Sequence, residues 1–449
     1  MEGFTSRLKA ALTDRTSTSL VLVGNFEVEE RWALGEHTLP RVTTTAGSAV
    51  VNHMDEFALL LGGRADHVVL KAAPDRGYLD YLDGLGLPLP TVHVVAAQEP
   101  RRTVTEDALA DPALLSELAR LDAVIVTHGV SDVEEQLAAR TGLRLAAPTA
   151  ALCKSVNSKV YSRRVADDIG LRQPAGFGCS TLAELREALD WARGPLAHGR
   201  AVVIKEAFGV SGKGIAVLRD ERRLDRLYRM IARQVEKTGD DRIAFVVEDW
   251  VDKAADLNYQ FTVGRDGSVR FDFVKEALTE GGVHKGHRMP ARLPSTAVEE
   301  LVASAEQIGK RLAADGYFGV AGVDALVDTA GGIYPVIEIN ARNNMSTYQV
   351  QLQERFVGPD KIAVAKHYPI RLTEPTSFDA VRTRLDGLVF DGATGLLVNN
   401  FATVNAAATP DQPFDGRLYG IVVATSPDEL TAIDDQVTAR IAGMRDGES

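Results

Sequence analysis

The segment with the clearest chemistry is GVDALVDTAGGIYPVIEINAR, residues 322–342, which predicts a β-hairpin carrying acidic and amide side chains. Residues 328–332 are a turn signal between two apolar runs. Side chains alternate between the two faces of a strand, so Glu338 and Asn340 project to the same side, and folding the hairpin brings Asp324 roughly opposite. Two carboxylates and an amide oxygen suit a hard cation such as Mg²⁺, whose coordination shell substrate phosphates would complete.

A glycine-containing loop upstream of this hairpin could contact such phosphates. The sequence FGVSGKG, residues 208–214, lies between two expected strands at 201–205 and 215–218. Its glycines let backbone N–H groups fold over an anion without obstruction by Cβ atoms. The segment is not a Walker loop, because no Gly-Lys-Ser/Thr sequence opens a helix. The alternative is a plain glycine-rich hairpin without a ligand.

Two lysines and an acidic strand end could form the rest of a nucleotide site. Lys205 ends the apolar run Val-Val-Ile-Lys, where burial is costly unless an anion pairs with the amine. Lys159 lies at an expected helix start. The backbone of residues 248–251 could pair with an adenine edge, and Asp256 could reach ribose hydroxyls. The alternatives are lysines that reach solvent and a solvated acidic strand end.

A polar segment, VKEALTEGGVHKGHRMP at residues 274–290, is expected to be a mobile loop. Its lysine, arginine and histidine side chains would suit a carboxylate or a phosphate. Zinc is not favoured, because the glycines rule out a helix that would align two histidines. The alternative is an ordinary exposed loop.

The first 150 residues are expected to position this chemistry from one side. Apolar strands at 19–23, 66–70 and 122–127 alternate with helical segments, which favours a parallel α/β sheet covered on both faces. No G-x-G-x-x-G follows the first strand, so a nicotinamide-dependent oxidoreductase is poorly supported.

The rest of the chain mixes helices and strands, which indicates an α+β arrangement. Two capping boxes, at 181–184 and at 296–299, are expected to open helices. The other expected elements are a charged helix over 219–237, strands at 244–248, 257–263 and 269–275, strands at 395–398 and 420–424, and a last helix over 428–444.

Bulk properties limit the class of protein. A length of 449 residues predicts two to four domains, and 45% hydrophobic with 25% charged residues is typical of a globular protein. The sequence has no uncharged apolar run of about 18 residues, so no membrane span is predicted. No secretory signal is visible either, so a cytoplasmic location is expected. The two cysteines do not indicate a disulfide framework. The net charge of −12 argues against nucleic-acid binding, and a homodimer is the default oligomeric expectation.

Taken in order, these features resemble the ATP-grasp superfamily of carboxylate–amine ligases. The resemblance covers about residues 150–350 and is carried by VVIKEAFGVSGKGI, VVEDWV and the hairpin sequence. It implies an ATP-grasp fold preceded by a parallel α/β domain, the pre-ATP-grasp domain. The domain boundaries it implies are an N-terminal α/β domain at 1–150, an ATP-grasp core at 151–369 with a lid at about 180–250, and a C-terminal α/β extension at 370–449.

The resemblance also implies a role for individual residues. The implied nucleotide-binding residues are Lys159, Lys205, Gly209, Ser211, Gly212, Gly214, Glu248, Asp249, Trp250, Val251 and Asp256. The implied ligands of Mg²⁺ (or Mn²⁺) are Asp324, Glu338 and Asn340. The implied catalytic residues are Arg342 and Lys205, which would neutralise the transferred phosphoryl group, with Arg288 and His284 beside the acyl group.

The function that follows is an ATP-dependent ligase that forms an amide bond through an acyl phosphate and releases ADP and phosphate. Residues 157–159 and the large C-terminal extension are also similar to the peptide ligases of pheganomycin-type biosynthesis. That similarity implies a modified amino acid joined through its carboxylate to a peptide amine in antibiotic biosynthesis. The alternatives are a ligase of free L-amino acids that makes dipeptides, and a non-enzymatic nucleotide-binding sensor. A biotin-dependent carboxylase is less favoured, because no biotin-carrier motif is present.

Overall fold

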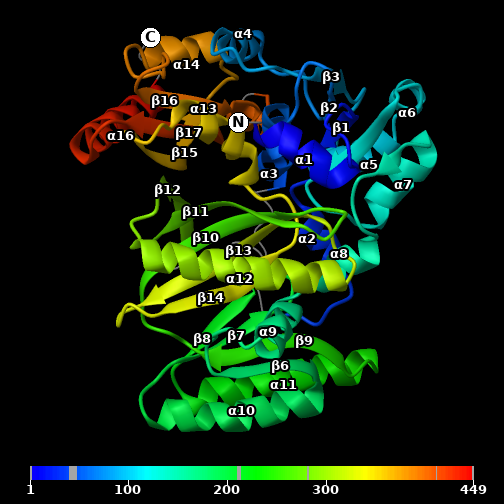
Figure 1. Ribbon diagram of the computed structural model, residues 1–449, viewed down its shortest axis with the longest axis vertical. Coiled ribbons are helices and arrows are strands. Elements are labelled where there is room, and N and C mark those ends of the chain that lie inside the picture. Colours follow the sequence, from blue (N-terminus) through cyan, green and yellow to red (C-terminus); the bar gives the residue numbers. More distant parts are fainter. Residues whose placement is uncertain (1–2, 40–47, 210–213, 281–282, 411, 447–449) are drawn as a thin grey trace.

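The computed structural model describes residues 3–39, 48–209, 214–280, 283–410 and 412–446. Three sheets organise the chain (Figure 1). The N-terminal sheet has five parallel strands in the order β3-β2-β1-β4-β5, which confirms the predicted parallel α/β sheet. Its strands are β1 Ser19–Val23, β2 His67–Leu70, β3 Thr91–Val94, β4 Ala123–Thr127 and β5 Arg144–Leu145.

Helices cover both faces of this sheet because its strands are continuous apolar runs, and apolar residues from both faces are buried in two separate clusters. The helices of this part of the chain are α1 Phe4–Thr13, α2 Val28–Trp32, α3 Ser48–Asn52, the 3₁₀ helix η1 His53–Leu61, α4 Arg76–Gly84, α5 Val104–Leu109, α6 Pro112–Leu118, α7 Asp132–Thr141 and α8 Ala150–Val156.

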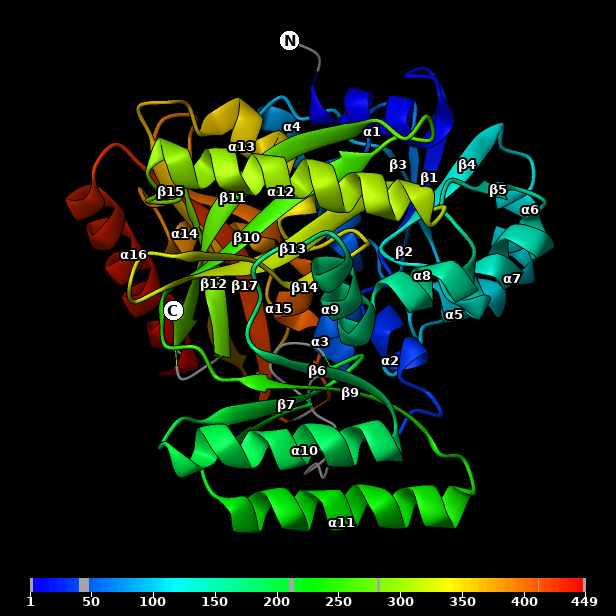
Figure 2. The ribbon, with the colours of Figure 1, turned by 60° about the horizontal axis from the view of Figure 1, so that its bottom comes forward.

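A small antiparallel sheet in the order β6-β9-β7-β8 forms the lid. Thr181 accepts a hydrogen bond from the backbone N–H of Glu184, and both halves of the predicted capping box are present. Helices α10 and α11 pack together on the outer side of this sheet, away from the body of the protein (Figure 2). The bounds are α9 Lys159–Asp168, β6 Gly176–Thr181, α10 Leu182–Ala197, β7 Val202–Glu206, β8 Ile215–Leu218, α11 Glu221–Thr238 and β9 Arg242–Asp249.

The central sheet is antiparallel, with eight strands in the order β14-β13-β10-β11-β12-β15-β17-β16. Strand β15 spans the expected boundary at 369/370, so the C-terminal strands continue the sheet of the core. The strands are β10 Lys253–Val263, β11 Val269–Glu280, β12 Val283–Met289, β13 Gly319–Asp328, β14 Ile333–Asn340, β15 Ile362–Leu372, β16 Gly395–Asn400 and β17 Phe414–Ala424. The helices are α12 Ser295–Ala314, η2 Thr347–Gln349, α13 Val350–Phe356, α14 Phe378–Arg384, α15 Ala402–Asn405, α16 Pro427–Ala442 and η3 Gly443–Asp446.

Two expectations about local structure are wrong. Helix α12 begins at Ser295 after Pro294 and has no side-chain cap, so the predicted capping box at Thr296 does not form. The segment expected to be a mobile loop contains strand β12, which pairs with β11 on one side and β15 on the other. Gly286 permits this pairing, because a Cβ atom there would lie 2.2 Å from the carbonyl oxygen of Ala365.

The N-terminal domain reaches the lid through residues 36–39, which we call the strap. Leu39 is 4% exposed and belongs to the apolar core of the lid. Its backbone N–H donates to Glu206 Oε1 at 2.5 Å. Gln234 of α11 donates to the carbonyl of Thr38 at 3.0 Å and accepts from its N–H at 3.3 Å. The strap therefore ties the N-terminal domain to both the sheet and a helix of the lid.

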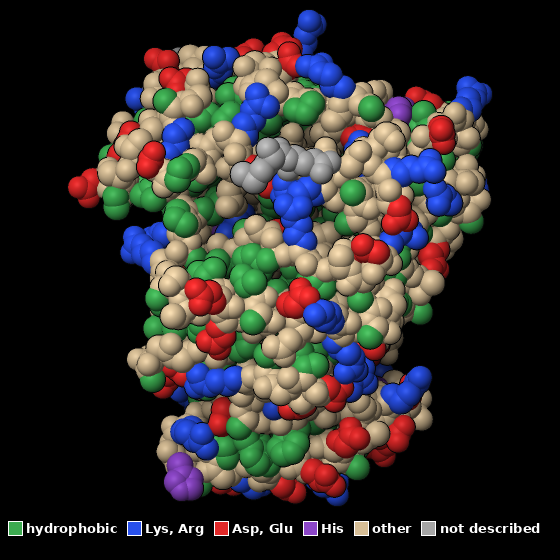
Figure 3. All heavy atoms as spheres, viewed as in Figure 1, with side chains coloured by type: hydrophobic (Ala, Val, Ile, Leu, Met, Phe, Trp, Pro, Cys, Tyr) green, Lys and Arg blue, Asp and Glu red, His purple; other side chains and the backbone are tan. Residues whose placement is uncertain are grey.

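The surface carries basic and acidic side chains interspersed from the top of the molecule to the lid, on the face shown in Figure 3. Among the described residues, no helix is both long enough and apolar enough to cross a membrane.

Candidate active site

The predicted hairpin is present, and its register places the expected metal ligands together. Asp324 on β13 lies directly opposite Glu338 on β14. Asn340 donates to Asp324 Oδ2 at 3.3 Å. On the other side of β13, Asn258 of β10 faces Asp324 and donates to its Oδ1 at 2.9 Å. Two carboxylates and two amides therefore share one face of the central sheet.

The donor atoms and the charges of this group suit a hard cation. Burial, together with the neighbouring carboxylate of Glu338, raises the pKa of Asp324 to about 6. Asn258 Oδ1 is buried and accepts no hydrogen bond from the described residues. A hard cation would favour both carboxylates in their charged form. Among the described residues, no group of three or more His, Cys, Asp or Glu side chains is placed to hold a metal ion.

A cavity of about 390 Å³ lies between the lid sheet and the central sheet, and most of the predicted site residues line it. Because these residues come from the lid, from the central sheet and from α9, the fold brings together positions as far apart as 159 and 342. The predicted residues at this cavity, which we call the nucleotide cavity, are Lys159, Lys205, Gly209, Glu248, Asp249, Trp250, Val251, Asp256, Asp324, Glu338, Asn340 and Arg342.

Both predicted lysines contact carboxylates at the cavity wall. Lys159 donates to Glu338 Oε1 at 2.6 Å and to the carbonyl of Gly209 at 2.8 Å. Lys205 forms an ion pair with Glu248, which also pairs with Arg163 at 3.0 Å. The lysines are buried, at 4% and 8% exposure. The amines of Lys159 and Lys205 are therefore held at the cavity wall by carboxylates, where they could contact a polyphosphate.

At the strand end 248–251, two backbone N–H groups already donate hydrogen bonds within the protein. The N–H groups of Asp249 and Trp250 donate to the carbonyls of Ala175 and Ala201, at 2.8 and 2.9 Å. A base edge at this wall would therefore have to use the carbonyl groups or the backbone of Val251. Asp256 accepts from Lys253 at 2.6 Å and from Thr279 at 2.8 Å.

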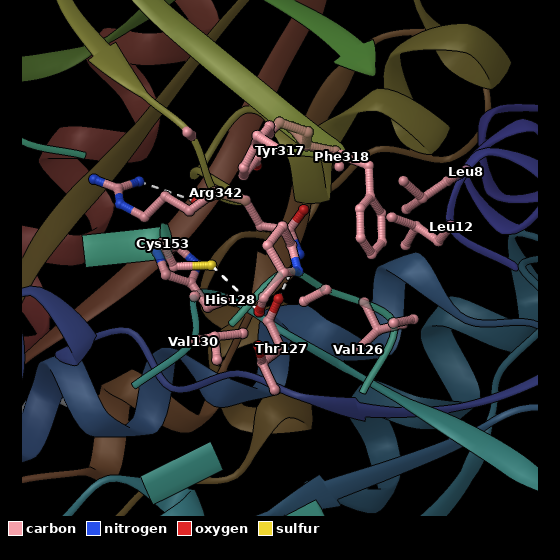
Figure 4. A pocket seen from close by; sticks show the side chains of 18 residues that line it. Leu8, Leu12, Val126, Thr127, His128, Val130, Cys153, Tyr317, Phe318 and Arg342 are labelled. Carbon is pink, nitrogen blue, oxygen red and sulfur yellow. Dashed lines mark hydrogen bonds between the residues drawn. The ribbon is translucent and has the colours of Figure 1, made fainter. Parts of the chain in front are cut away.

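Arg342 joins the hairpin to the N-terminal domain. Its Nη2 donates to Asn340 Oδ1 at 3.2 Å, and its guanidinium forms an ion pair with the buried carboxylate of Glu29 on α2. Arg342 also lies at one edge of a small cavity of about 40 Å³, and Figure 4 shows its guanidinium pointing away from the apolar side chains there. Burial, with Arg342 as the nearby charge, holds the pKa of His128 well below its usual value.

Some predicted residues do not lie at the nucleotide cavity. Arg288 contacts Glu276 at 3.4 Å and does not line the cavity. His287, its neighbour on β12, lines it instead, because successive side chains of a strand point to opposite faces. Gly214 accepts a backbone hydrogen bond from Glu206 at 2.8 Å and is not among the lining residues. Ser211, Gly212 and the side chain of His284 lie outside the described residues.

Three residues of the site, Asn258, His287 and Glu29, were missed from the sequence. Asn258 could have been found, because it lies two positions after Asp256 on a predicted strand and shares its face. His287 belongs to the polar segment but could not be assigned a face without the register of β12. Glu29 lies in a different domain from Arg342, and nothing in the local sequence links the two residues.

Comparisons with known proteins agree with this geometry. A family model of the pre-ATP-grasp domain matches residues 54–143, and a model of the ATP-grasp domain matches residues 181–346. Over 398 residues the chain is 24% identical to the [butirosin acyl-carrier protein]–L-glutamate ligase of Niallia circulans, covering 88% of this chain and 85% of that protein.

Solved structures share the fold at low sequence identity. The N5-carboxyaminoimidazole synthetase of Staphylococcus aureus complexed with ADP is 14% identical, with a TM-score of 0.53 over 95% of this chain and 97% of that one. The biotin carboxylase domain of the Hydrogenobacter thermophilus 2-oxoglutarate carboxylase, in complex with MgADP, is 14% identical, with a TM-score of 0.55 over 96% and 94%. At these identities the likeness concerns the fold alone.

Proposed function

The chain belongs to the ATP-grasp superfamily of carboxylate–amine ligases, and we propose that it joins a carboxylate to an amine by way of an acyl phosphate. The observation that carries this proposal is the composition of the nucleotide cavity. Two buried lysines, an acidic and amide face, and an arginine at its edge line a single space between lid and core. These groups suit the phosphates of ATP, the metal that accompanies them and a transferring phosphoryl group.

In the proposed first step, a substrate carboxylate attacks the γ-phosphorus of ATP, which forms an acyl phosphate and releases ADP. Lys159 and Lys205 would hold the phosphates in place, and Arg342 would stabilise the charge on the transferring group. Asp324, Glu338 and Asn340 would hold Mg²⁺, which supplies charge neutralisation at the phosphate oxygens.

In the second step, an amine attacks the acyl carbon and phosphate leaves. No protein nucleophile is needed, so catalysis rests on position and charge. The lid covers the nucleotide cavity, and exclusion of water there would protect the acyl phosphate from hydrolysis.

The finer substrate assignment is a modified amino acid joined to a peptide amine in antibiotic biosynthesis. It is supported by the similarity to a butirosin biosynthetic ligase, whose name gives L-glutamate and an acyl-carrier protein as its substrates. The alternative is a ligase of free L-amino acids. Comparing the rate of ADP formation with free amino acids and with peptides as amines would separate the two.

Trapping with hydroxylamine tests the proposed intermediate. Hydroxylamine converts an acyl phosphate to a hydroxamate, so pools of amino acids and peptides should give hydroxamate and ADP in equal amounts. Lys205→Met should lower both products by at least about 100-fold, while Arg163 still neutralises Glu248 and keeps the site folded. Lys237→Met, at an exposed position of α11, is the control and should match the wild type. ADP release without hydroxamate from every pool would contradict the acyl-phosphate step.

A further inference from the structure

A second cavity, of about 290 Å³, lies beside the nucleotide cavity. His287, Arg342 and Met345 line both, so the two spaces meet at the end of the site that holds the predicted phosphoryl-transfer arginine. The second cavity is enclosed by three parts of the chain: the N-terminal domain, strand β12 of the core, and the paired strands β15, which crosses from the core into the C-terminal extension, and β17 of that extension. Figure 1 shows the extension and the N-terminal domain on the same side of the molecule, opposite the lid.

The wall formed by the extension is basic and aromatic. Arg417 and Tyr419 are alternate residues of β17, and Tyr419 lies directly opposite His367 of β15, so the three side chains share one face. Arg417 donates to the hydroxyl of Tyr419 at 3.5 Å and has no carboxylate partner among the described residues. The rings of His367 and Tyr419 are 5.3 Å apart. A half-buried guanidinium without a counter-charge, beside a phenol, is suited to a carboxylate.

A neighbouring lysine also lines this cavity, but a carboxylate neutralises its charge. Lys366 is adjacent to His367 on β15, and its ammonium pairs with Asp434 of α16 at 2.6 Å. That helix packs against β15 and β17. The charge available to a ligand on the extension side is therefore that of Arg417.

The wall formed by the N-terminal domain is acidic. Glu27, Glu29 and Glu30 lie at the start of α2 and line the same cavity. Glu29 is held by Arg342, at the junction with the nucleotide cavity, while Glu30 is exposed and has no ion-pair partner among the described residues. The cavity thus has an acidic wall on the N-terminal domain, where Glu29 contacts Arg342, and the guanidinium of Arg417 on the wall formed by β15 and β17, while Lys285 lines it from β12. Val51, Met54 and Met345 supply an apolar surface between them.

This polarity matches a ligand with a cationic end and an anionic end. We propose that the second cavity binds the amine substrate, and that this substrate carries a free carboxylate of its own, held by Arg417, His367 and Tyr419. The substrate is then an amino acid or a peptide with an unmodified C-terminus, its amino group directed to the glutamates near Arg342. This inference rests on the proposed function, and it assigns the C-terminal extension the recognition of the carboxylate that does not react.

Ligand-observed saturation-transfer NMR tests this assignment. The full-length protein, with Mg²⁺ and a non-hydrolysable ATP analogue, is mixed with a pool of proteinogenic L-amino acids and simple dipeptides, or with the corresponding pool of C-terminal amides. We expect transfer to members of the carboxylate pool and at least about tenfold weaker binding of their amides. Arg417→Gln should weaken binding of the carboxylate form by at least about tenfold and remove the discrimination between the pools.

Arg371→Gln is the matched control. Arg371 lies on β15, pairs with Asp415 on the surface and does not line the second cavity, so this variant should bind like the wild type. Equal binding of acids and amides by the wild type, unchanged binding by Arg417→Gln, or no binding of either pool would overturn the proposal. Binding of the ATP analogue, followed in the same samples, separates the proposed ligase function from the proposed carboxylate site. Loss of ATP-analogue binding would count against the ligase function. Retained binding of the analogue, with no discrimination between acids and amides, would count against the carboxylate site alone.

Discussion

Lys275 is a buried amine whose removal should stabilise the protein. The side chain is 0% exposed, and burial lowers its pKa from 10.5 to about 7. Its Nζ donates to Gln349 Oε1 at 3.2 Å, and the ring centroid of Phe273 lies 4.5 Å away. Among the described residues no carboxylate pairs with it. A buried cation without a counter-charge costs stability. Lys275 lies directly opposite Asn258 on the neighbouring strand, so it shares the sheet face of the predicted metal ligands, which points to a functional reason for its presence.

The two pKa values set the size of the effect. The pKa of Lys275 falls by about 3.5 between the unfolded chain and the folded protein. At about pH 6 the amine is charged in both the folded and the unfolded protein, and the shift then corresponds to a loss of roughly 5 kcal/mol in the free energy of unfolding. The folded pKa is depressed, so this cost shrinks as the pH rises through 7 and is nearly gone at about 10.5. Lys275→Met avoids the cost but leaves Gln349 without its donor, at about 1–2 kcal/mol. We therefore expect the variant to be more stable by roughly 3 kcal/mol at pH 6.

Urea denaturation between pH 6 and 10, in the absence of nucleotide, measures this difference. The advantage of Lys275→Met should narrow steadily with increasing pH. Lys310→Met, at an exposed position of α12 that pairs with Glu306, is the control and should show no such trend. A variant that is less stable than the wild type at pH 6, or an advantage that does not change with pH, would refute the reasoning.

Three further predictions concern the contacts between domains. Glu56 accepts hydrogen bonds from the N–H groups of Phe401 and Ala402, and burial raises its pKa to about 7. The contribution of protonated Glu56 to the free energy of unfolding is present in full below about pH 4.5 and is lost as the pH rises through 7. Glu56→Gln should therefore remove about 3 kcal/mol from the pH dependence of the free energy of unfolding, measured by urea titration. An unchanged pH dependence would show that Glu56 is not the titrating group. Leu39→Ala should cost about 2–4 kcal/mol and speed hydrogen exchange in the lid but not in the central sheet, and uniform exchange changes would contradict a local role for the strap. Arg342→Ala should lower turnover in the hydroxamate assay far more than ATP affinity, and the reverse would place Arg342 in ground-state binding.

Much of the site could be predicted because it depends on local patterns. The hairpin turn and the alternation of side chains fixed Asp324, Glu338 and Asn340 on one face, and the register confirms that face. The order of lysines, glycine loop and acidic strand end indicated the family. The parallel N-terminal sheet followed from continuous apolar strands, and its order could not have been read from them.

The rest depends on contacts between distant segments. Strand β12 was interpreted as a loop because its glycines and charges are typical of loops, yet strands on both sides satisfy its backbone and Gly286 allows the close approach of β15. Whether Arg288 or His287 faces the cavity depends on that pairing. The contact of Glu29 with Arg342 and the position of Arg417 require the relative placement of three parts of the chain, for which a single sequence carries no local signal.

The central claim is that the acidic hairpin binds a metal-bound nucleotide. Isothermal titration calorimetry with ATP, in the presence and absence of Mg²⁺, tests it most directly on the wild type, on Glu338→Gln and on the surface control Glu306→Gln. We expect Mg²⁺-dependent binding in the wild type and the control, and at least about tenfold weaker, Mg²⁺-insensitive binding in Glu338→Gln. Equal, Mg²⁺-dependent affinity in all three proteins would contradict the assignment of the hairpin as the metal site.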